Sequence, residues 1–235
     1  MKTYIKVLIT GVLASAVIAF FIFYDFNKQE KEAAGDYEKE QAKNENVQAV
    51  DIAVQDYLLP LENSKKRLTP ISHVMLHFTS NVAEKPKDPY LMEDIYTIFE
   101  DYGVSAHYAI DREGVIYRLV AENRVAFHAG TGILQGFPAY EDNLNDYSIG
   151  IELLAIGSKE EMNEFIDEAT YDSLDPSLIG YTDAQYAAVE RLLDMLHEQY
   201  PEIERNREHV VGHDEYAPDR KSDPGILFDW SRIGY

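Results

Sequence analysis

The fold is decided first by residues 71–78, Ile-Ser-His-Val-Met-Leu-His-Phe. This apolar run predicts a buried strand that ends in His77. A second short apolar strand is predicted at 148–154, and a third at 209–212 delivers His213. Side chains at the carboxyl ends of such strands project into the opening of an α/β sheet. His77 and His213 are therefore the first candidate site residues.

Helices and a hairpin surround these strands. Asp88-Pro89 predicts a helix start, and Gly103 predicts its end. Segments 105–110 and 115–120 flank Asp-Arg-Glu-Gly, which is typical of a hairpin. We therefore expect an α/β fold, a single domain with a central mixed sheet flanked by helices.

A longer helix is predicted after Thr182, which forms a capping box with Gln185. Pro201 predicts its end. Its inner face is apolar, whereas His197 falls on the outer side and is interpreted as a surface residue. The inner-face residues are Tyr186, Val189, Leu193 and Leu196.

The N-terminal part has a different composition. Two lysines lie in residues 1–6, and residues 7–24 contain no charge, which predicts a transmembrane helix with the remaining chain outside the cytoplasm. A cleaved signal segment, giving a secreted protein, is the alternative. Residues 25–66 are predicted to form a charged stalk, with a short amphipathic helix over 47–58, before a domain at 67–235.

Charge and cysteine content exclude several classes of protein. The formal charge is −21, from 42 acidic and 21 basic residues, so nucleic acid is not an expected partner. The chain has no cysteine. Disulfides, thiolate catalysis and cysteine-ligated metals are thereby excluded.

His77, His213 and Asp223 form a candidate ligand set. Two histidines and a carboxylate suit a catalytic zinc with one open position for water. Asp223 follows the second histidine by ten residues. The alternative is that each histidine is an ordinary core residue.

Glu152 lies within the apolar run Ile-Gly-Ile-Glu-Leu-Leu at 149–154. An unpaired buried carboxylate costs several kcal/mol. The residue is therefore either a general base beside a metal or part of an internal salt bridge. Lys221 is a candidate for oxyanion stabilisation, although alone it would be an ordinary surface lysine.

Six ordered blocks resemble the type 2 N-acetylmuramoyl-L-alanine amidases, which include phage lysozyme-type amidases and animal peptidoglycan recognition proteins. The resemblance runs from about residue 70 to Trp230. The blocks are Val74–Thr79, Ser105–Gly114, Phe127–Gly130, Asn145–Leu153, Tyr181–Tyr186 and Val211–Gly225.

The resemblance implies a peptidoglycan recognition protein/amidase-like fold and a peptidoglycan hydrolase. Such an enzyme uses zinc-activated water to cleave the amide between N-acetylmuramic acid and L-alanine. His77, His213 and Asp223 would hold Zn²⁺, Glu152 would be the acid/base, and Lys221 would stabilise the tetrahedral intermediate. His128 would contact the substrate, or would simply pack within its loop.

Two alternatives keep the same fold. One is a peptidoglycan-binding module without catalysis, and the other is a phage endolysin of the same chemistry. The expected partners are peptidoglycan and the cytoplasmic membrane, with the enzyme domain on the extracytoplasmic side. The stem-peptide specificity, the physiological role, the role of acidic residues 157–181 and the oligomeric state stay open.

Overall fold

The computed structural model describes residues 52–235. The predicted segments at 1–6 and 7–24, and the stalk as far as residue 51, lie outside the described residues. Within 52–235, no helix is long and apolar enough to cross a membrane. The described residues belong to one compact unit, in agreement with a single α/β domain.

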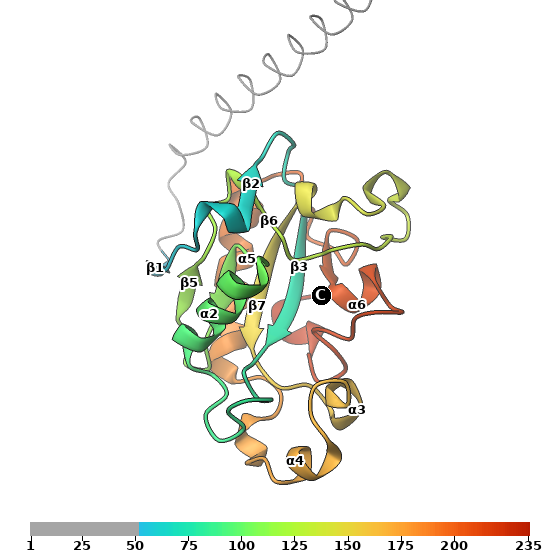
Figure 1. The fold of residues 1–235 in the computed structure, drawn as a ribbon. Coiled ribbons are helices and arrows are strands. Elements are labelled where there is room, and N and C mark those ends of the chain that lie inside the picture. The colour runs from blue at the N-terminus through green and yellow to red at the C-terminus, as the bar shows by residue number, and fades with distance from the viewer. Residues whose placement is uncertain (1–51) are drawn as a thin grey trace, which may run out of the picture. The chain divides into compact units, whose positions relative to one another are not determined.

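Six strands form a mixed central sheet in the order β1-β5-β4-β7-β3-β8 (Figure 1). Neighbouring strands are parallel except β4 and β5, which form the predicted hairpin. A second sheet pairs β2 with β6 antiparallel. The strands are β1 (Val54–Asp56), β2 (Ser64–Lys66), β3 (His73–Thr79), β4 (Tyr108–Ile110), β5 (Ile116–Arg118), β6 (Arg124–Ala126), β7 (Ser148–Leu154) and β8 (Val210–Gly212).

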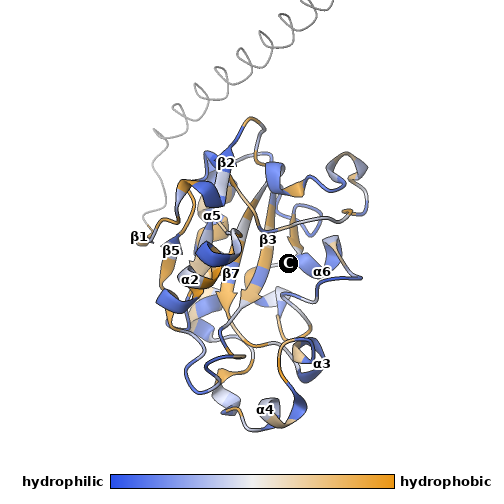
Figure 2. Ribbon diagram, in the orientation of Figure 1, coloured by the Kyte–Doolittle hydropathy of each residue, from blue (hydrophilic) through white to orange (hydrophobic). Residues whose placement is uncertain are grey.

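Side-chain alternation gives the sheet two different faces. Val74 and Leu76 of β3 pack on the face covered by α5 (Asp183–Gln199). Met75 lies on the opposite face, in a cluster with Tyr216 of α6 (His213–Tyr216). The same face carries α2 (Met92–Tyr102), and Figure 2 shows β7 between these layers as a mostly hydrophobic strand. His77 therefore points away from α5, because it alternates with Leu76.

Helix α5 confirms the predicted capping box and apolar face. The Thr182 hydroxyl accepts from the Gln185 N–H, and the Gln185 amide oxygen accepts from the Thr182 N–H. The interpretation of His197 as a surface residue is wrong. His197 is buried and its Nδ1 donates to the Ile203 carbonyl at 2.8 Å, because the chain after α5 folds back over this side of the helix.

Helix α2 begins later than predicted. Its N-cap is Leu91, so the proposed start at Asp88-Pro89 is wrong. The Pro89 carbonyl instead accepts from the Asn81 N–H at 2.8 Å, which closes a preceding turn. Gly103 ends the helix in the left-handed conformation, with φ of 65°, as predicted.

The boundary between stalk and domain is also wrong. Residues 54–56 form a strand beside β5, and residues 64–66 form a strand beside β6, so the domain begins before residue 67. Where the predicted helix over 47–58 is described, it is replaced by β1. Arg67 anchors this region because its buried guanidinium donates to the Asp146 and Ser148 carbonyls.

Two long connections carry short helices. The acidic segment 157–181 contains α3 (Lys159–Met162), α4 (Glu168–Asp172) and the 3-10 turn η4 (Pro176–Leu178). Met162, Ile166 and Leu174 of this segment form a small buried cluster with Val82 and Ile156. The loop before β7 contains η2 (Pro138–Tyr140) and η3 (Leu144–Tyr147); two further 3-10 turns are η1 (Leu61–Asn63) and η5 (Trp230–Ile233).

Candidate metal centre and active site

Strand register brings the predicted site residues together. His77 on β3 pairs with Glu152 on β7, and Leu76 pairs with Gly212 at the end of β8. His213 directly follows Gly212 and begins α6. Three adjacent strands thus end at one place, as expected for a site at the carboxyl edge of parallel strands.

Asp223 reaches this edge from the chain after α6. Its backbone carbonyl accepts from the Asp214 N–H at 2.8 Å, which holds the turn of Asp223 against the start of α6. The Asp223 side chain then faces both histidines. Its position depends on the loop rather than on a strand.

His77, His213 and Asp223 form a group that can hold a metal ion. The two Nδ1 atoms of the histidines lie 3.0 Å apart. The Asp223 Oδ2 lies 2.8 Å from the Nδ1 of His77 and 3.1 Å from the Nδ1 of His213. All three residues are buried. Three electron-pair donors therefore converge on one small volume.

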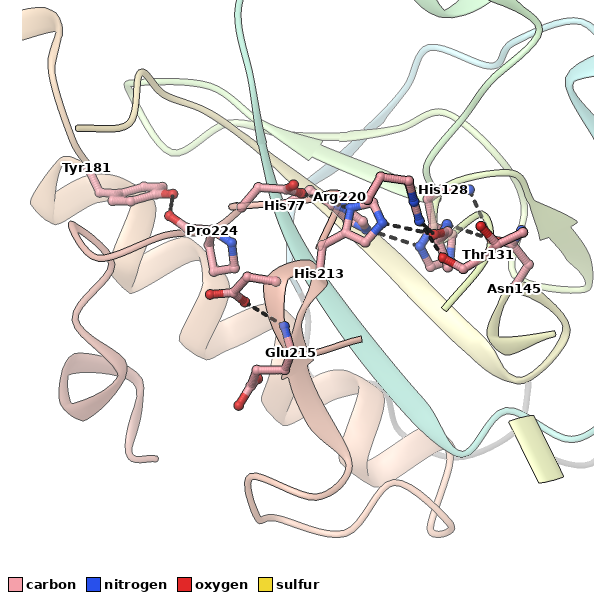
Figure 3. Close-up of polar contacts among 12 residues, drawn as sticks. His77, His128, Thr131, Asn145, Tyr181, His213, Glu215, Arg220 and Pro224 are labelled. Carbon is pink, nitrogen blue, oxygen red and sulfur yellow. Dashed lines mark hydrogen bonds and ion pairs between the residues drawn. The ribbon is translucent and has the colours of Figure 1, made fainter. Parts of the chain in front are cut away.

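The other ring nitrogen of each histidine already has a partner. His213 Nε2 lies 2.9 Å from the Ala129 carbonyl, which can only accept, so this nitrogen carries the proton. His77 Nε2 lies 3.1 Å from His128 Nδ1 (Figure 3). With its Nε2 protonated, neutral His213 presents an Nδ1 lone pair to the site. Two imidazole nitrogens and one carboxylate fit a divalent zinc, with a further position left for water.

Burial favours the neutral form of His77. It lowers the pKa of His77 to about 4, although the adjacent Asp223 carboxylate, which favours a protonated His77, opposes this shift. Burial also opposes ionisation of Asp223, but the adjacent His213 and His77 outweigh it and lower the pKa of Asp223. Neutral imidazole and ionised carboxylate are the forms that bind metal.

Glu152 points to the same side of the sheet as His77. Burial and the negative charge of Asp223 raise the pKa of Glu152 to about 8, and Lys221 partly opposes this rise. Its Oε2 atom is buried without a hydrogen-bond partner. The internal salt bridge considered from the sequence is therefore not supported. A carboxyl group with a raised pKa suits proton transfer near neutral pH.

All six residues predicted for the site line one cavity. Of these, Lys221 and His128 are half-buried. Burial, reinforced by the neighbouring His77, lowers the pKa of His128 well below its usual value. The other lining residues are Phe78, Thr79, Phe99, Val104, Ser105, Phe127, Glu164, Phe165, Arg220 and Ser222.

Two residues at or behind the cavity were not predicted from the sequence. Phe165 is an exposed aromatic residue contributed by the acidic segment, and its exposure was not apparent from the pattern. Asn145 lies behind the cavity, where its Oδ1 accepts from the backbone N–H groups of His128 and Ala129 at 3.0 and 2.8 Å (Figure 3). Asn145 does belong to one of the blocks that carried the family resemblance, which was the available signal.

Comparison with known proteins defines the class. Residues 67–226 match the family model described as N-acetylmuramoyl-L-alanine amidase. This match spans more than half of the chain, so the chain belongs to the N-acetylmuramoyl-L-alanine amidase family. The resemblance inferred from six sequence blocks is confirmed.

Individual relatives agree with this assignment. The chain is 39% identical over 130 residues to 1,6-anhydro-N-acetylmuramyl-L-alanine amidase AmpD of Escherichia coli K12. The match covers 55% of this chain and 56% of that relative, so the chain spans about half the length of the curated relatives it matches.

Two solved structures share the fold. A selenomethionine derivative of AmpD superposes with a TM-score of 0.56 and 29% identity, covering 77% of this chain and 92% of that chain. AmiD of E. coli, in complex with the substrate anhydro-N-acetylmuramic acid-L-Ala-D-gamma-Glu-L-Lys, gives a TM-score of 0.52 and 26% identity. That comparison covers 80% of this chain and 60% of AmiD.

Proposed function

We propose that this chain is a zinc-dependent N-acetylmuramoyl-L-alanine amidase that hydrolyses peptidoglycan. The observation that carries the proposal is the convergence of His77, His213 and Asp223 beside Glu152, whose Oε2 atom has no hydrogen-bond partner. A metal site alone would be compatible with a structural ion. The adjacent proton-transfer group favours a hydrolase.

The chemistry divides between the metal and the protein. Zinc held by His77, His213 and Asp223 would supply Lewis-acid polarisation of a carbonyl and lower the pKa of water. Glu152 takes the proton from the attacking water and returns it to the departing L-alanine nitrogen. Lys221, a cation at the same cavity, stabilises the negative charge that develops on the carbonyl oxygen. The products are a glycan strand and a free stem peptide.

The substrate is the amide bond between N-acetylmuramic acid and L-alanine. The family match and the named substrate of AmiD support this class of muropeptide. A peptidoglycan-binding module without catalysis is the competing function. Glu152 favours the enzyme, because this residue is half-buried and its buried Oε2 atom has no hydrogen-bond partner.

The uncharged run of residues near the N-terminus supports a proposal for where the enzyme is located. Residues 7–24 are uncharged and follow two lysines, so we propose an uncleaved membrane anchor with the amidase domain outside the cytoplasm. An anchor of this kind would hold the domain close to the cell wall. Cleavage of the segment would instead release a secreted enzyme.

One assay tests the proposed activity. The full chain, purified in detergent, is incubated with peptidoglycan with zinc, with a chelator, and with chelator followed by excess zinc. We expect new N-terminal L-alanine groups with zinc, loss of this release with the chelator, and its return with added zinc. Binding to peptidoglycan without release of L-alanine would identify the non-catalytic alternative.

A further inference from the structure

A series of hydrogen bonds begins at Nε2 of His77, on the side of the ring opposite the Nδ1 atom that faces the metal position. His77 Nε2 lies 3.1 Å from His128 Nδ1, and His128 Nε2 lies 3.2 Å from the Ser148 hydroxyl. The Ser148 hydroxyl donates to the Leu144 carbonyl at 2.7 Å. Ser148 is buried and His128 is half-buried.

The donor and the acceptor of each hydrogen bond in this series can be assigned by starting from the Leu144 carbonyl. The Leu144 carbonyl only accepts, so it takes the single hydroxyl proton of Ser148. The Ser148 oxygen must then accept from His128 Nε2–H. Neutral His128 is left with a lone pair on Nδ1, which accepts from His77 Nε2–H. His77 consequently presents its Nδ1 lone pair to the metal position that it shares with His213 and Asp223.

The His128 ring packs closely against β7. A Cβ atom at Gly150 would lie 2.5 Å from the Cγ of His128, so the ring lies directly against the bare backbone of β7. The backbone of His128 is held by Asn145, whose Oδ1 accepts the His128 N–H. Side chain and backbone are therefore fixed by different neighbours.

The next residue performs the same task for the second histidine. The Ala129 carbonyl accepts from His213 Nε2, and the Ala129 N–H donates to the same Asn145 oxygen that holds His128. Arg220 also donates to this carbonyl at 2.8 Å. Two consecutive residues thus orient the two histidines, one through its side chain and the other through its backbone.

We propose that His128 is a positioning residue that fixes the tautomer and ring orientation of His77 for metal binding. This inference deepens the proposed function, because it rests on the same metal site. The sequence left two roles open for His128, a substrate contact or packing within its loop, and the proposed role differs from both. Both ring nitrogens of His128 already have partners within the protein, so neither is free to bind peptidoglycan.

The test uses two substitutions of His128 in the full-length protein. His128→Leu removes the acceptor for His77. In His128→Asn the amide oxygen occupies about the position of Nδ1 and retains an acceptor. His209→Asn is the matched control, because it removes another half-buried histidine whose Nδ1 bonds to the Ser72 carbonyl away from the cavity.

The main measurement is the zinc dissociation constant, determined by competition with a chromophoric chelator. Loss of an orienting partner of a ligand weakens metal binding about 10–100-fold. We expect this loss in His128→Leu, substantial recovery in His128→Asn and no change in His209→Asn. Thermal melting of the metal-free variants separates this effect from a general loss of stability.

A second measurement does not require zinc. Nitrogen chemical shifts of the His77 ring in the metal-free protein should indicate a proton on Nε2 in the wild type and a mixture of tautomers in His128→Leu.

An unchanged zinc dissociation constant together with a raised KM in His128→Leu would overturn the inference and leave the amidase proposal intact. Equal weakening in the leucine and asparagine variants, accompanied by lower metal-free melting temperatures, would also overturn it. A wild-type protein that binds no zinc would overturn the proposed function, and unchanged His77 tautomers would separately overturn this inference.

Discussion

His77 and Glu152 occupy paired positions on the neighbouring parallel strands β3 and β7. Paired residues on adjacent strands point to the same face of the sheet. A candidate metal ligand and a carboxyl with a raised pKa are therefore held side by side by backbone hydrogen bonds. This arrangement does not depend on the conformation of a loop, whereas the position of Asp223 does.

His213→Ala should remove most of the bound zinc. The substitution deletes one of three donors and leaves His77 and Asp223, and two ligands hold zinc far less tightly than three. Elemental analysis of the purified wild type should give about one zinc per chain, as expected for a single site. Full retention of zinc in the variant would exclude His213 as a ligand.

Glu152→Gln should lower the rate of peptidoglycan cleavage by about 10²–10⁴-fold, the usual contribution of general acid–base catalysis. Glutamine retains the size of the side chain but cannot transfer the proton. Zinc content and binding to peptidoglycan should be unchanged, because neither requires this proton. Cleavage near the wild-type rate by a zinc-loaded variant would remove Glu152 from the mechanism.

The interior of the fold was predictable because its signals are local. The apolar run of β7 was assigned with its observed ends, and the Thr182–Gln185 capping box marked the start of α5. Strand ends then indicated His77 and His213. These features depend on neighbouring residues in the chain, so they can be recognised in the sequence itself.

The errors concern elements that depend on distant residues. β1 and β2 are three-residue strands that exist because β5 and β6 lie beside them, and neither has enough length to give a period. His197 is buried by the C-terminal chain, which the helical pattern of α5 cannot reveal. The contacts of His128 likewise depend on Ser148 and Asn145 from another segment.

Glu161→Ala should destabilise the acidic segment and the turn that follows Asp223. One carboxylate oxygen of Glu161 accepts from the Ser158 N–H and the other accepts from the Ile226 N–H, each at 2.7 Å. Loss of charge-assisted hydrogen bonds of this kind costs about 1–3 kcal/mol. Chemical denaturation should detect the loss, and Glu160→Ala, at an exposed neighbouring position, is the matched control. Equal stability of the two variants would show that Glu161 does not join these segments.

The proposed anchor predicts the N-terminus of the membrane-bound protein. N-terminal sequencing of the membrane fraction should begin at or near Met1, because an uncharged run of 18 residues at 7–24 is long enough for most of a bilayer core. Protease added to protoplasts should digest the amidase domain. A mature protein that begins within or after this run would instead identify a cleaved signal segment.

The raised pKa of Glu152 predicts how the stability of the metal-free protein depends on pH. The carboxyl has a pKa of about 8 in the folded protein, compared with an ordinary value of 4.5. Between these values the folded state holds a proton that the unfolded state has released. The free energy of unfolding should therefore fall as pH rises through this window, by up to about 1.4 kcal/mol per pH unit.

Measurements in the upper part of this pH range isolate the contribution of Glu152 to the free energy of unfolding. His77 has a pKa lowered to about 4 from 6.5, so its effect on stability has the opposite sign but ends near pH 6.5. Chemical denaturation of the chelator-treated protein between about pH 6.5 and 8 should thus report mainly Glu152. Glu152→Gln should flatten the slope, because glutamine does not titrate. Zinc should flatten it as well, because a cation beside the carboxyl favours the ionised form already at lower pH. A wild-type slope that survives in Glu152→Gln would assign the titration to another group and remove the basis for a protonated Glu152 in the metal-free protein.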